Sequence, residues 1–249
     1  MVKMISKVVL MSSLVFSFTA CGNSFSNPDQ TVLNDDPTTE QPGNSTAGEG
    51  DTTDKNLVEL TPPSENQGDK EVTLSKYDYL DPNHIVPSKA LADAVAYFEA
   101  NQSKIGNKNY IAVINFSQSS KEKRFYIIDM KTGKVMAIHV AHGKGSDPDH
   151  DGYATKFSNL SGSNASSLGF YTTAETYSGS HGLSLKLDGR SSTNSNARSR
   201  AIVIHGADYV SESSVIQGRS WGCPAVTMSL RTQVINMLKG GALINAVYK

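Results

Sequence analysis

The sequence contains little cysteine. Its 249 residues include only Cys21 and Cys223. Cys21 falls in an export segment in which a lipid would occupy its sulfur, so we expect no intramolecular disulfide. The rest of the chain keeps one thiol in a compartment that oxidises spare thiols. Two interpretations of Cys223 are open at this point: it packs as a small hydrophobe in the core, or it is a nucleophile.

Aromatic residues are scarce between residues 22 and 75, where Phe25 is the only one. A segment rich in Asn, Asp, Thr, Pro, Gly, Glu and Ser buries too little apolar surface to offset its ordering entropy. We therefore predict a disordered tether over residues 21–75. It carries 11 acidic and 2 basic residues, which leaves 13 acidic and 19 basic residues for 76–249. The formal net charge of −1 thus hides a basic domain, whose charge favours an acidic polymer or surface as partner.

The N-terminus has the pattern of an export signal. Two lysines precede an apolar run over residues 8–18, which is too short for a comfortable membrane crossing. The small residues Thr19 and Ala20 then precede Cys21, which resembles the lipobox of bacterial lipoproteins. We predict a signal peptide over residues 1–20 and a lipid on Cys21, with ordinary secretion as the alternative. Gly22 stands where Asp would favour inner-membrane retention, so we expect an outer-membrane anchor facing the periplasm or cell wall.

Residues 76–249 are long enough for one domain with a substantial core, and they show no internal repeat. Pro87 before a Ser88 cap, followed by apolar residues at helical spacing, predicts a helix that begins there. The pattern then predicts strands at residues 110–116, 124–130, 135–141, 169–173, 183–187, 201–204 and 242–247, and a short helix at 228–239. Many short strands with few helices predict a mainly β fold, a sandwich or barrel, with one helix N-terminal to it.

Cys223 has the neighbours of a reactive thiol. His205 ends the apolar segment AIVIH and precedes Cys223 by 18 residues, across a polar loop. A thiol attacks as its thiolate, so it needs a base beside it, and a histidine at a strand end is suited to that role. Gly222 has no Cβ, which lets adjacent backbone N–H groups face a developing oxyanion. This pattern favours the nucleophile over the packing residue.

The same segments resemble the L,D-transpeptidase catalytic domain family. IHGA, residues 204–207, and SWGC, residues 220–223, are similar to the family's signature around its histidine and cysteine. SSLGFYTT, residues 166–173, is similar to the segment before the active-site strand. FSN, SLKLDG and GRSWGCPA have the form found in the murein L,D-transpeptidase subgroup. The resemblance covers about residues 110–249, with the segments in the same order.

The resemblance implies a β-sandwich enzyme that acts on peptidoglycan stem peptides without a metal or cofactor. Cys223 would attack the carbonyl of an L-centred residue, release D-alanine and leave a thioester, which an amine resolves. His205 matches the general base, a role worth about 10²–10⁴-fold in rate. The N–H groups of Gly222 and Cys223 would form the oxyanion hole. The carbonyl of Gly206 or, as the side-chain option, Asp208 would orient the imidazole.

Two positions of the nucleophile loop depart from the family pattern. Trp221 stands where many relatives have His, and Ala225 stands where many have Arg or Asn. The substrate carboxylate must then be held from elsewhere, and Arg219 is the nearest cation in the sequence. We expect Arg219, Ser220, Trp221 and His142 to line the substrate cleft. Structural roles for Trp221 and His142 are equal alternatives.

The remaining motifs carry weaker signals. His181 lies in a predicted turn, where we expect a solvated side chain, and three other histidines show no partner at useful spacing. FSN, residues 157–159, would support the cleft by hydrogen bonds. DPDHDG, residues 147–152, matches the first half of a calcium loop, but Ser158 stands where the bidentate Glu should be. We therefore predict an acidic surface turn and no metal.

Three alternative functions stay open. An L,D-carboxypeptidase or other peptidoglycan hydrolase of the same fold would resolve the thioester with water. A papain-like hydrolase places its Cys ahead of its His in the chain, the reverse of the order here. A non-catalytic wall-binding lipoprotein would have no need of an intact His205, Gly222 and Cys223. The expected partners are stem peptides and, through Cys21, a membrane; we expect no nucleic acid, and the oligomeric state is open.

Overall fold

The structure is a computed structural model that describes residues 76–248. The predicted signal peptide over 1–20 and the predicted tether over 21–75 lie outside these residues. The helices, 3₁₀ turns and strands, in chain order, are α2 (Ser88–Ala100), β1 (Tyr110–Asn115), β2 (Phe125–Asp129), β3 (Val135–Ile138), η1 (Lys144–Ser146), β4 (Gly169–Gly179), β5 (Gly182–Gly189), η2 (Ser192–Asn194), β6 (Val203–Ala207), β7 (Ala225–Thr227), α3 (Met228–Leu238) and β8 (Leu243–Val247).

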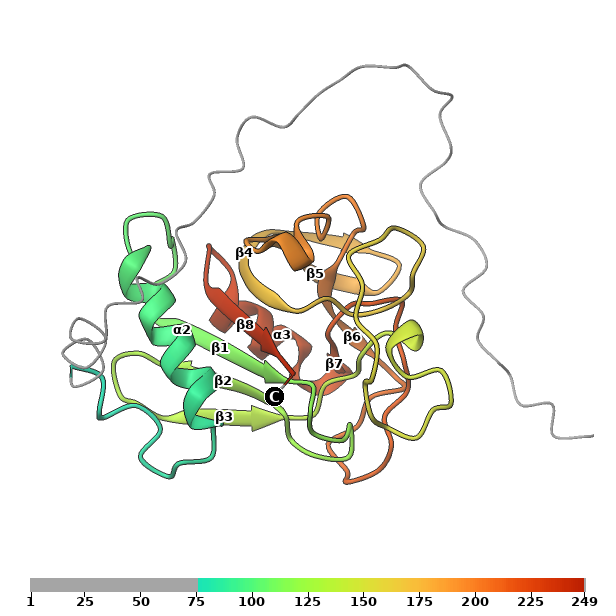
Figure 1. Ribbon diagram of the computed structural model, residues 1–249, viewed down its shortest axis with the longest axis horizontal. Coiled ribbons are helices and arrows are strands. Elements are labelled where there is room, and N and C mark those ends of the chain that lie inside the picture. The colour runs from blue at the N-terminus through green and yellow to red at the C-terminus, as the bar shows by residue number, and fades with distance from the viewer. Residues whose placement is uncertain (1–75, 249) are drawn as a thin grey trace, which may run out of the picture. The chain divides into compact units, whose positions relative to one another are not determined.

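The strands of the described part form one sheet in the order β3-β2-β1-β8-β4-β5-β6-β7 (Figure 1). Neighbouring strands are antiparallel except for the pairs β1–β8 and β6–β7, which are parallel. The chain that leaves β3 reaches the opposite edge of the sheet, where Ala141 donates its N–H to the carbonyl of Ala225 in β7 at 2.9 Å. This bridge nearly closes the sheet. The predicted mainly β fold with few helices is confirmed.

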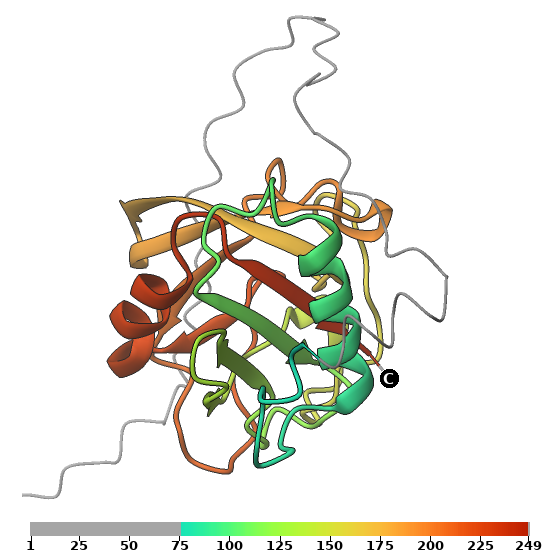
Figure 2. The same ribbon diagram turned by 90° about the vertical axis from the view of Figure 1, so that its left-hand side faces the viewer.

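The two longer helices cover opposite faces of the sheet (Figure 2). Side chains alternate between the two faces along a strand. In β1, Ala112 and Ile114 lie in the core that contains α3, whereas Ile111 and Val113 lie in the core that contains α2. Strand β1 is therefore buried on both faces, which explains its almost unbroken apolar sequence. No helix within residues 76–248 is long and apolar enough to cross a bilayer.

Helix α2 begins one residue earlier than its predicted cap implies. Pro87 is the N-cap and makes no side-chain capping bond, and Ser88 is already helical. Proline suits a helix start because its ring fixes φ and it has no N–H to leave unpaired. The helix is held to the sheet by Tyr97, whose ring stacks on Phe170 of β4 with centroids 3.8 Å apart. The helix itself is confirmed, and its predicted serine cap is wrong.

Strand boundaries differ from prediction in the places that build the site. Strand β6 covers Val203–Ala207 rather than 201–204, so His205 lies inside the strand and not at its end. Strand β7 was not predicted, because three residues are too few to show a period. Strand β3 stops at Ile138 rather than at residue 141, since the next N–H donates to the carboxylate of Glu212 instead of a neighbouring strand.

Replacing Tyr97 with Phe should stabilise the domain. The Tyr97 hydroxyl is buried and has no hydrogen-bond partner among the described residues. Burying such a group unpaired costs about 1–3 kcal/mol. Tyr97→Phe keeps the ring that stacks on Phe170 and removes only the hydroxyl, so we expect the free energy of unfolding in urea to rise by roughly 1 kcal/mol. Tyr97→Ala, the control, should lower it by about 3–5 kcal/mol. A clear loss in Tyr97→Phe would contradict the assignment of an unpaired hydroxyl.

Candidate active site

His205 is held in the middle of β6 with its ring on the face opposite to the main core. Ile204, its neighbour, lies in that core, and alternation turns His205 the other way. The residue is only 2% exposed. Its Nδ1 lies 3.0 Å from the carbonyl oxygen of Gly206. A carbonyl only accepts hydrogen bonds, so Nδ1 carries the proton and Nε2 is left as the basic nitrogen.

Burial keeps the imidazole neutral. Desolvation lowers the pKa of His205 to about 4, against a smaller raising effect of the hydrogen bond to Gly206. At neutral pH the ring is therefore an unprotonated base. The expected orienting role of Gly206 agrees with this geometry. Asp208, the side-chain option, is exposed and forms no hydrogen bond or ion pair within residues 76–248, so the structure gives it no part in orienting the ring.

Cys223 lies two residues before β7, at the edge of the sheet next to β6. Its thiol accepts a hydrogen bond from the N–H of Val203 at 3.4 Å and donates to the carbonyl of Ala201 at 3.7 Å. The thiol therefore contacts the backbone of β6 two residues before His205, and Cys223 also packs against the core that contains Ile204. The residue is partly exposed. Burial of the sulfur nevertheless raises the pKa of Cys223 to about 11, against lowering effects of the Val203 N–H and Arg200.

The resting pair is thus a neutral thiol and a neutral imidazole. A thiol with a pKa near 11 and a base with a pKa near 4 do not exchange a proton at neutral pH. No hydrogen bond joins Cys223 to His205 in the described structure, which is common before substrate closes such a contact.

Gly222 has a backbone conformation that favours glycine. Its φ is +118°, and a Cβ there would lie 2.7 Å from the carbonyl oxygen of Ala165. Its N–H, however, donates to the hydroxyl of Ser220 at 3.1 Å. The expected oxyanion role of Gly222 is therefore wrong for this conformation, because its donor is already used. The N–H of Cys223 has no hydrogen-bond partner among the described residues and stays available for that role.

Ser220 holds the nucleophile loop and does not line a cleft. It is buried, and its hydroxyl donates to the carbonyl of Cys223 at 2.6 Å while accepting from Gly222. Its N–H donates to the carbonyl of His142 at 2.9 Å, and its own carbonyl accepts from Lys144 at 2.7 Å. The predicted cleft position is corrected to an internal one: the hydroxyl fixes the path of the chain through Cys223.

The prediction that His142 lines the substrate cleft is also wrong. The residue is 1% exposed, and both of its ring nitrogens are occupied. Arg124 donates to Nδ1 at 2.6 Å, and Nε2–H donates to Asp147 at 3.0 Å. This buried Arg–His–Asp cluster lies under the nucleophile loop. Desolvation, followed by the charge of Arg124, lowers the pKa of His142 to about 4, so a neutral ring separates the two charges.

The acidic turn, residues 147–152, is joined to the Arg–His–Asp cluster through Asp147. Asp147, Asp149 and Asp151 have carboxylate oxygens within 4.8 Å of one another. Asp147 is nevertheless committed to internal contacts, because it accepts the N–H groups of Asp151 and Gly152 at 3.1 Å as well as His142. This geometry is that of a turn stabilised by a buried carboxylate.

Arg219 and Trp221 flank the loop differently. Arg219 donates to the carbonyls of Asp147 and Pro148, which makes it a brace between the loop and the acidic turn. Trp221 is 47% exposed, which rules out a core role and leaves its ring free to meet a ligand.

Two histidines that showed no partner in the sequence also anchor the segment between His205 and Cys223. His139 pairs with Glu212 at 3.2 Å, and His150 lies 3.0 Å from the carbonyl of Gln217. Both partners belong to that segment. The polar segment between His205 and Cys223 is therefore held both by the residue after β3 and by the acidic turn.

Arg200 is a site residue that sequence reasoning missed. It donates to the carbonyls of Ser158 and Ala165 at 2.7 and 2.6 Å. The first contact joins the FSN segment, residues 157–159, to Arg200 by a hydrogen bond. A Cβ on Gly222 would lie 3.1 Å from the Arg200 guanidinium, so this cation sits against the nucleophile loop. No carboxylate in the described part pairs with it, and nothing in its sequence context announces that position.

His181 is the second residue that was missed. It lies in the turn between β4 and β5 and is exposed, as expected. Its ring also stacks on that of His205, with centroids 4.3 Å apart and an interplanar angle of 27°. The two residues are 24 positions apart in the sequence, and only the pairing of β5 with β6 brings them together.

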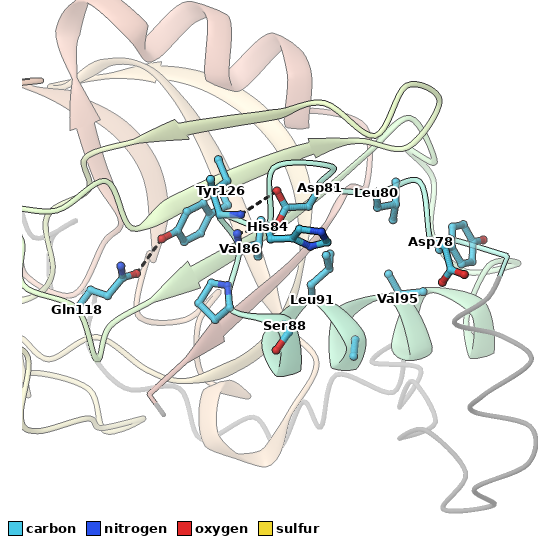
Figure 3. Close-up of a pocket in the computed structure, with 14 residues that line it drawn as sticks. Asp78, Leu80, Asp81, His84, Val86, Ser88, Leu91, Val95, Gln118 and Tyr126 are labelled. Carbon is cyan, nitrogen blue, oxygen red and sulfur yellow. Dashed lines mark hydrogen bonds between the residues drawn. The ribbon is translucent and has the colours of Figure 1, made fainter.

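A separate groove of about 610 Å³ lies beside α2 (Figure 3). Residues 77–95, Gln118 and Tyr126 contribute its lining, and none of them belongs to the site around His205. Its buried acid, Asp81, accepts the N–H of Val86 at 2.7 Å, and Tyr126 donates to Gln118 at 2.9 Å. Asp81 therefore serves the local turn, and Tyr126 and Gln118 pair with each other.

Acidification should destabilise the domain through its two buried neutral histidines. His142 and His205 have an ordinary pKa of 6.5 when unfolded, and burial lowers each pKa to about 4 in the fold. Between those values the unfolded chain binds more protons. The free energy of unfolding should therefore fall as pH drops through this window, by up to about 1.4 kcal/mol per pH unit for each histidine. Urea unfolding at a series of pH values measures the slope.

His205→Asn is the matched control for this slope. It removes one of the two titrating rings. The slope of the free energy of unfolding against pH should therefore fall by the contribution of one histidine, up to about 1.4 kcal/mol per pH unit. A free energy of unfolding that stays level across the window would show that the two rings are not buried as neutral groups.

The model of the L,D-transpeptidase catalytic domain family matches residues 82–247. Among solved structures, the chain is similar to the LD transpeptidase LdtMt1 in complex with imipenem, at 14% identity over 56% of this chain and 59% of that one, with a TM-score of 0.36. It is similar to the L,D-transpeptidase from Xylanimonas cellulosilytica, at 12% identity over 56% and 60%, with a TM-score of 0.34.

A third similar structure is the helical cell shape determining protein Pgp2 from Campylobacter jejuni, at 13% identity over 58% of this chain and 50% of that one, with a TM-score of 0.34. The chain spans between half and three fifths of the length of these three structures. Curated proteins gave no significant match. The family match covers more than half of the chain. The chain therefore belongs to the L,D-transpeptidase catalytic domain family.

Proposed function

We propose that this protein is a cysteine acyltransferase that acts on peptidoglycan stem peptides, with Cys223 as nucleophile and His205 as general base. The observation that carries the proposal is the state of His205. Its Nδ1 proton is committed to the carbonyl of Gly206, so a basic Nε2 is left on the strand that the thiol touches. Membership of the family makes peptidoglycan the expected substrate.

Acylation begins when the donor carbonyl approaches the thiol. The sulfur attacks that carbon while Nε2 of His205 takes the thiol proton, which forms the S–C bond and an oxyanion. The free N–H of Cys223 is placed to stabilise this charge, and one such donor is worth roughly 3 kcal/mol in other acyl-transfer enzymes. Collapse breaks the C–N bond, and His205 returns its proton to the departing amine of D-alanine. The product is a thioester with a neutral imidazole.

The second half-reaction runs the same steps in reverse. The amine of an acceptor attacks the thioester, and His205 removes its proton. The C–S bond then breaks, and the sulfur recovers the proton from His205. The imidazole is neutral at the start of each half-reaction, which is the state that its low pKa ensures.

Charge supports an anionic wall polymer as substrate. Residues 76–249 carry 19 basic and 13 acidic side chains. Arg200 adds a cation without a carboxylate partner in the described part, next to Gly222. Ala225 offers no charge after Cys223, whereas the Arg200 guanidinium lies against Gly222 and favours a negatively charged donor.

Water in place of the amine would make the protein an L,D-carboxypeptidase, and the site geometry serves both acceptors. We further propose that Cys21 carries a lipid and that the domain works at the outer membrane, facing the wall. The N-terminal pattern supports this anchor: an apolar run over residues 8–18, then small residues before Cys21.

Incubation with tetrapeptide muropeptides should acylate Cys223. We expect intact-mass spectrometry to show a gain equal to the donor minus D-alanine, together with free D-alanine in solution. Cys223→Ala should fold normally and show neither product. His205→Ala should keep the thiol and slow acylation by about 10²–10⁴-fold, because a general base contributes that much.

Product analysis separates transfer from hydrolysis. A cross-linked or amine-exchanged muropeptide identifies a transferase, and a shortened tripeptide alone identifies a carboxypeptidase. If wild type and Cys223→Ala leave the substrate in the same state, the catalytic proposal fails.

A further inference from the structure

A tight hairpin between β4 and β5 places His181 next to His205. Strands β4 and β5 pair up to Gly179 and Gly182, which leaves Ser180 and His181 as the two residues of the turn. On the far side of β5, Ser184 pairs with His205 of β6. The turn therefore stands beside the C-terminal half of β6, and the His181 ring folds back over the His205 ring with centroids 4.3 Å apart.

Helix α3 fixes the tip of this hairpin. Arg231 donates to the carbonyl of His181 at 3.2 Å. Gly182 has a φ of +67°, and a Cβ there would lie 2.7 Å from the Arg231 guanidinium. A Cβ on Gly206 would likewise lie 2.7 Å from the sulfur of Met228, also on α3. Glycines at both positions let α3 approach the turn and β6 closely. Helix α3 therefore supports the two segments that carry the stacked rings of His181 and His205.

We propose that His181 is a positioning residue for the general base: its ring packs on His205, fixes the plane of that imidazole and keeps water from one face. The inference rests on the proposed function, because it gives His181 a part in the work of the same base. The nucleophile loop supplies the exposed Trp221 rather than an imidazole. The second histidine of the site comes instead from the hairpin.

The His181 ring reduces the access of water to the His205 ring. His205 is 2% exposed on β6, a strand paired on both sides, and the ring of the exposed His181 stacks on its ring. Desolvation is the main cause that lowers the pKa of His205, and the proximity of His181 lowers it further. Arg231 of α3 donates to the carbonyl of His181, and the other charged or titratable groups on the flanking segments are Cys223 before β7 and Asp208 just beyond the end of β6.

The test follows the titration of His205 directly. NMR of the full protein would record the His205 ring signals against pH in wild type, His181→Ala and His181→Phe. In wild type the midpoint should lie near 4. His181→Ala hydrates the ring, and we expect its midpoint to rise by roughly one pH unit, tenfold in the protonation equilibrium. His181→Phe keeps the ring-on-ring contact and should stay near wild type.

Activity supplies the second readout. The acid limb of kcat/KM for the muropeptide should move upward with the midpoint in His181→Ala and return in His181→Phe. His84→Asn, which removes an exposed histidine outside the site, should match wild type in both measurements. A wild-type midpoint and rate in His181→Ala would overturn the proposal. So would a His181→Phe variant as impaired as His181→Ala, since the stack would then not be the cause.

The two proposals fail separately. If wild type forms no thioester with stem peptides, the proposed function fails. The NMR titration needs no substrate, so it still decides whether His181 controls the state of His205.

Discussion

The hydrogen bond from Nδ1 of His205 to the carbonyl of Gly206 sets the chemistry of the whole site. At 3.0 Å it fixes the tautomer, and so places the lone pair on Nε2. Because donor and acceptor belong to adjacent residues of one buried strand, the bond persists only while β6 keeps its pairing with β5 and β7. The nearly closed sheet is therefore a condition of the proposed chemistry: it holds His205, and it brings the edge that carries Cys223 against the same strand.

The loop that carries Cys223 depends on a different set of contacts. Ser220 uses its hydroxyl, its N–H and its carbonyl within or beneath the loop. Below it lies Arg124, fully buried, with desolvation lowering its pKa to about 9 against the raising effect of Asp147. A buried Arg–His–Asp cluster adds little net stability, since desolvating its charges offsets their attraction. Its value here is geometric: removing any member would leave a buried charge unpaired under Cys223.

The sequence indicates candidate site residues where the proposed chemistry sets their spacing. Cys223 and His205 stand out because a nucleophilic thiol needs a base beside it, and Gly222 because it has no Cβ before the thiol. The presence of most strands was also predictable, because apolar and polar residues alternate along a strand that is buried on one face. The failures have one cause, which is contact between segments distant in the chain. His181 and Arg200 reach the site through strand pairing and loop packing. His142 leaves the cleft because Arg124 and Asp147 enclose it, and neither partner shows in its local pattern.

In the proposed mechanism the Cys223 thiol keeps its proton until a substrate arrives, and the pH dependence of alkylation tests this most directly. With Cys21→Ser, Cys223 is the only cysteine of the protein. Its rate of reaction with iodoacetamide should rise steadily through the alkaline range, with a midpoint that reports a pKa of about 11. A rate that is already level at neutral pH would reveal a thiolate–imidazolium pair at rest, and would contradict the account.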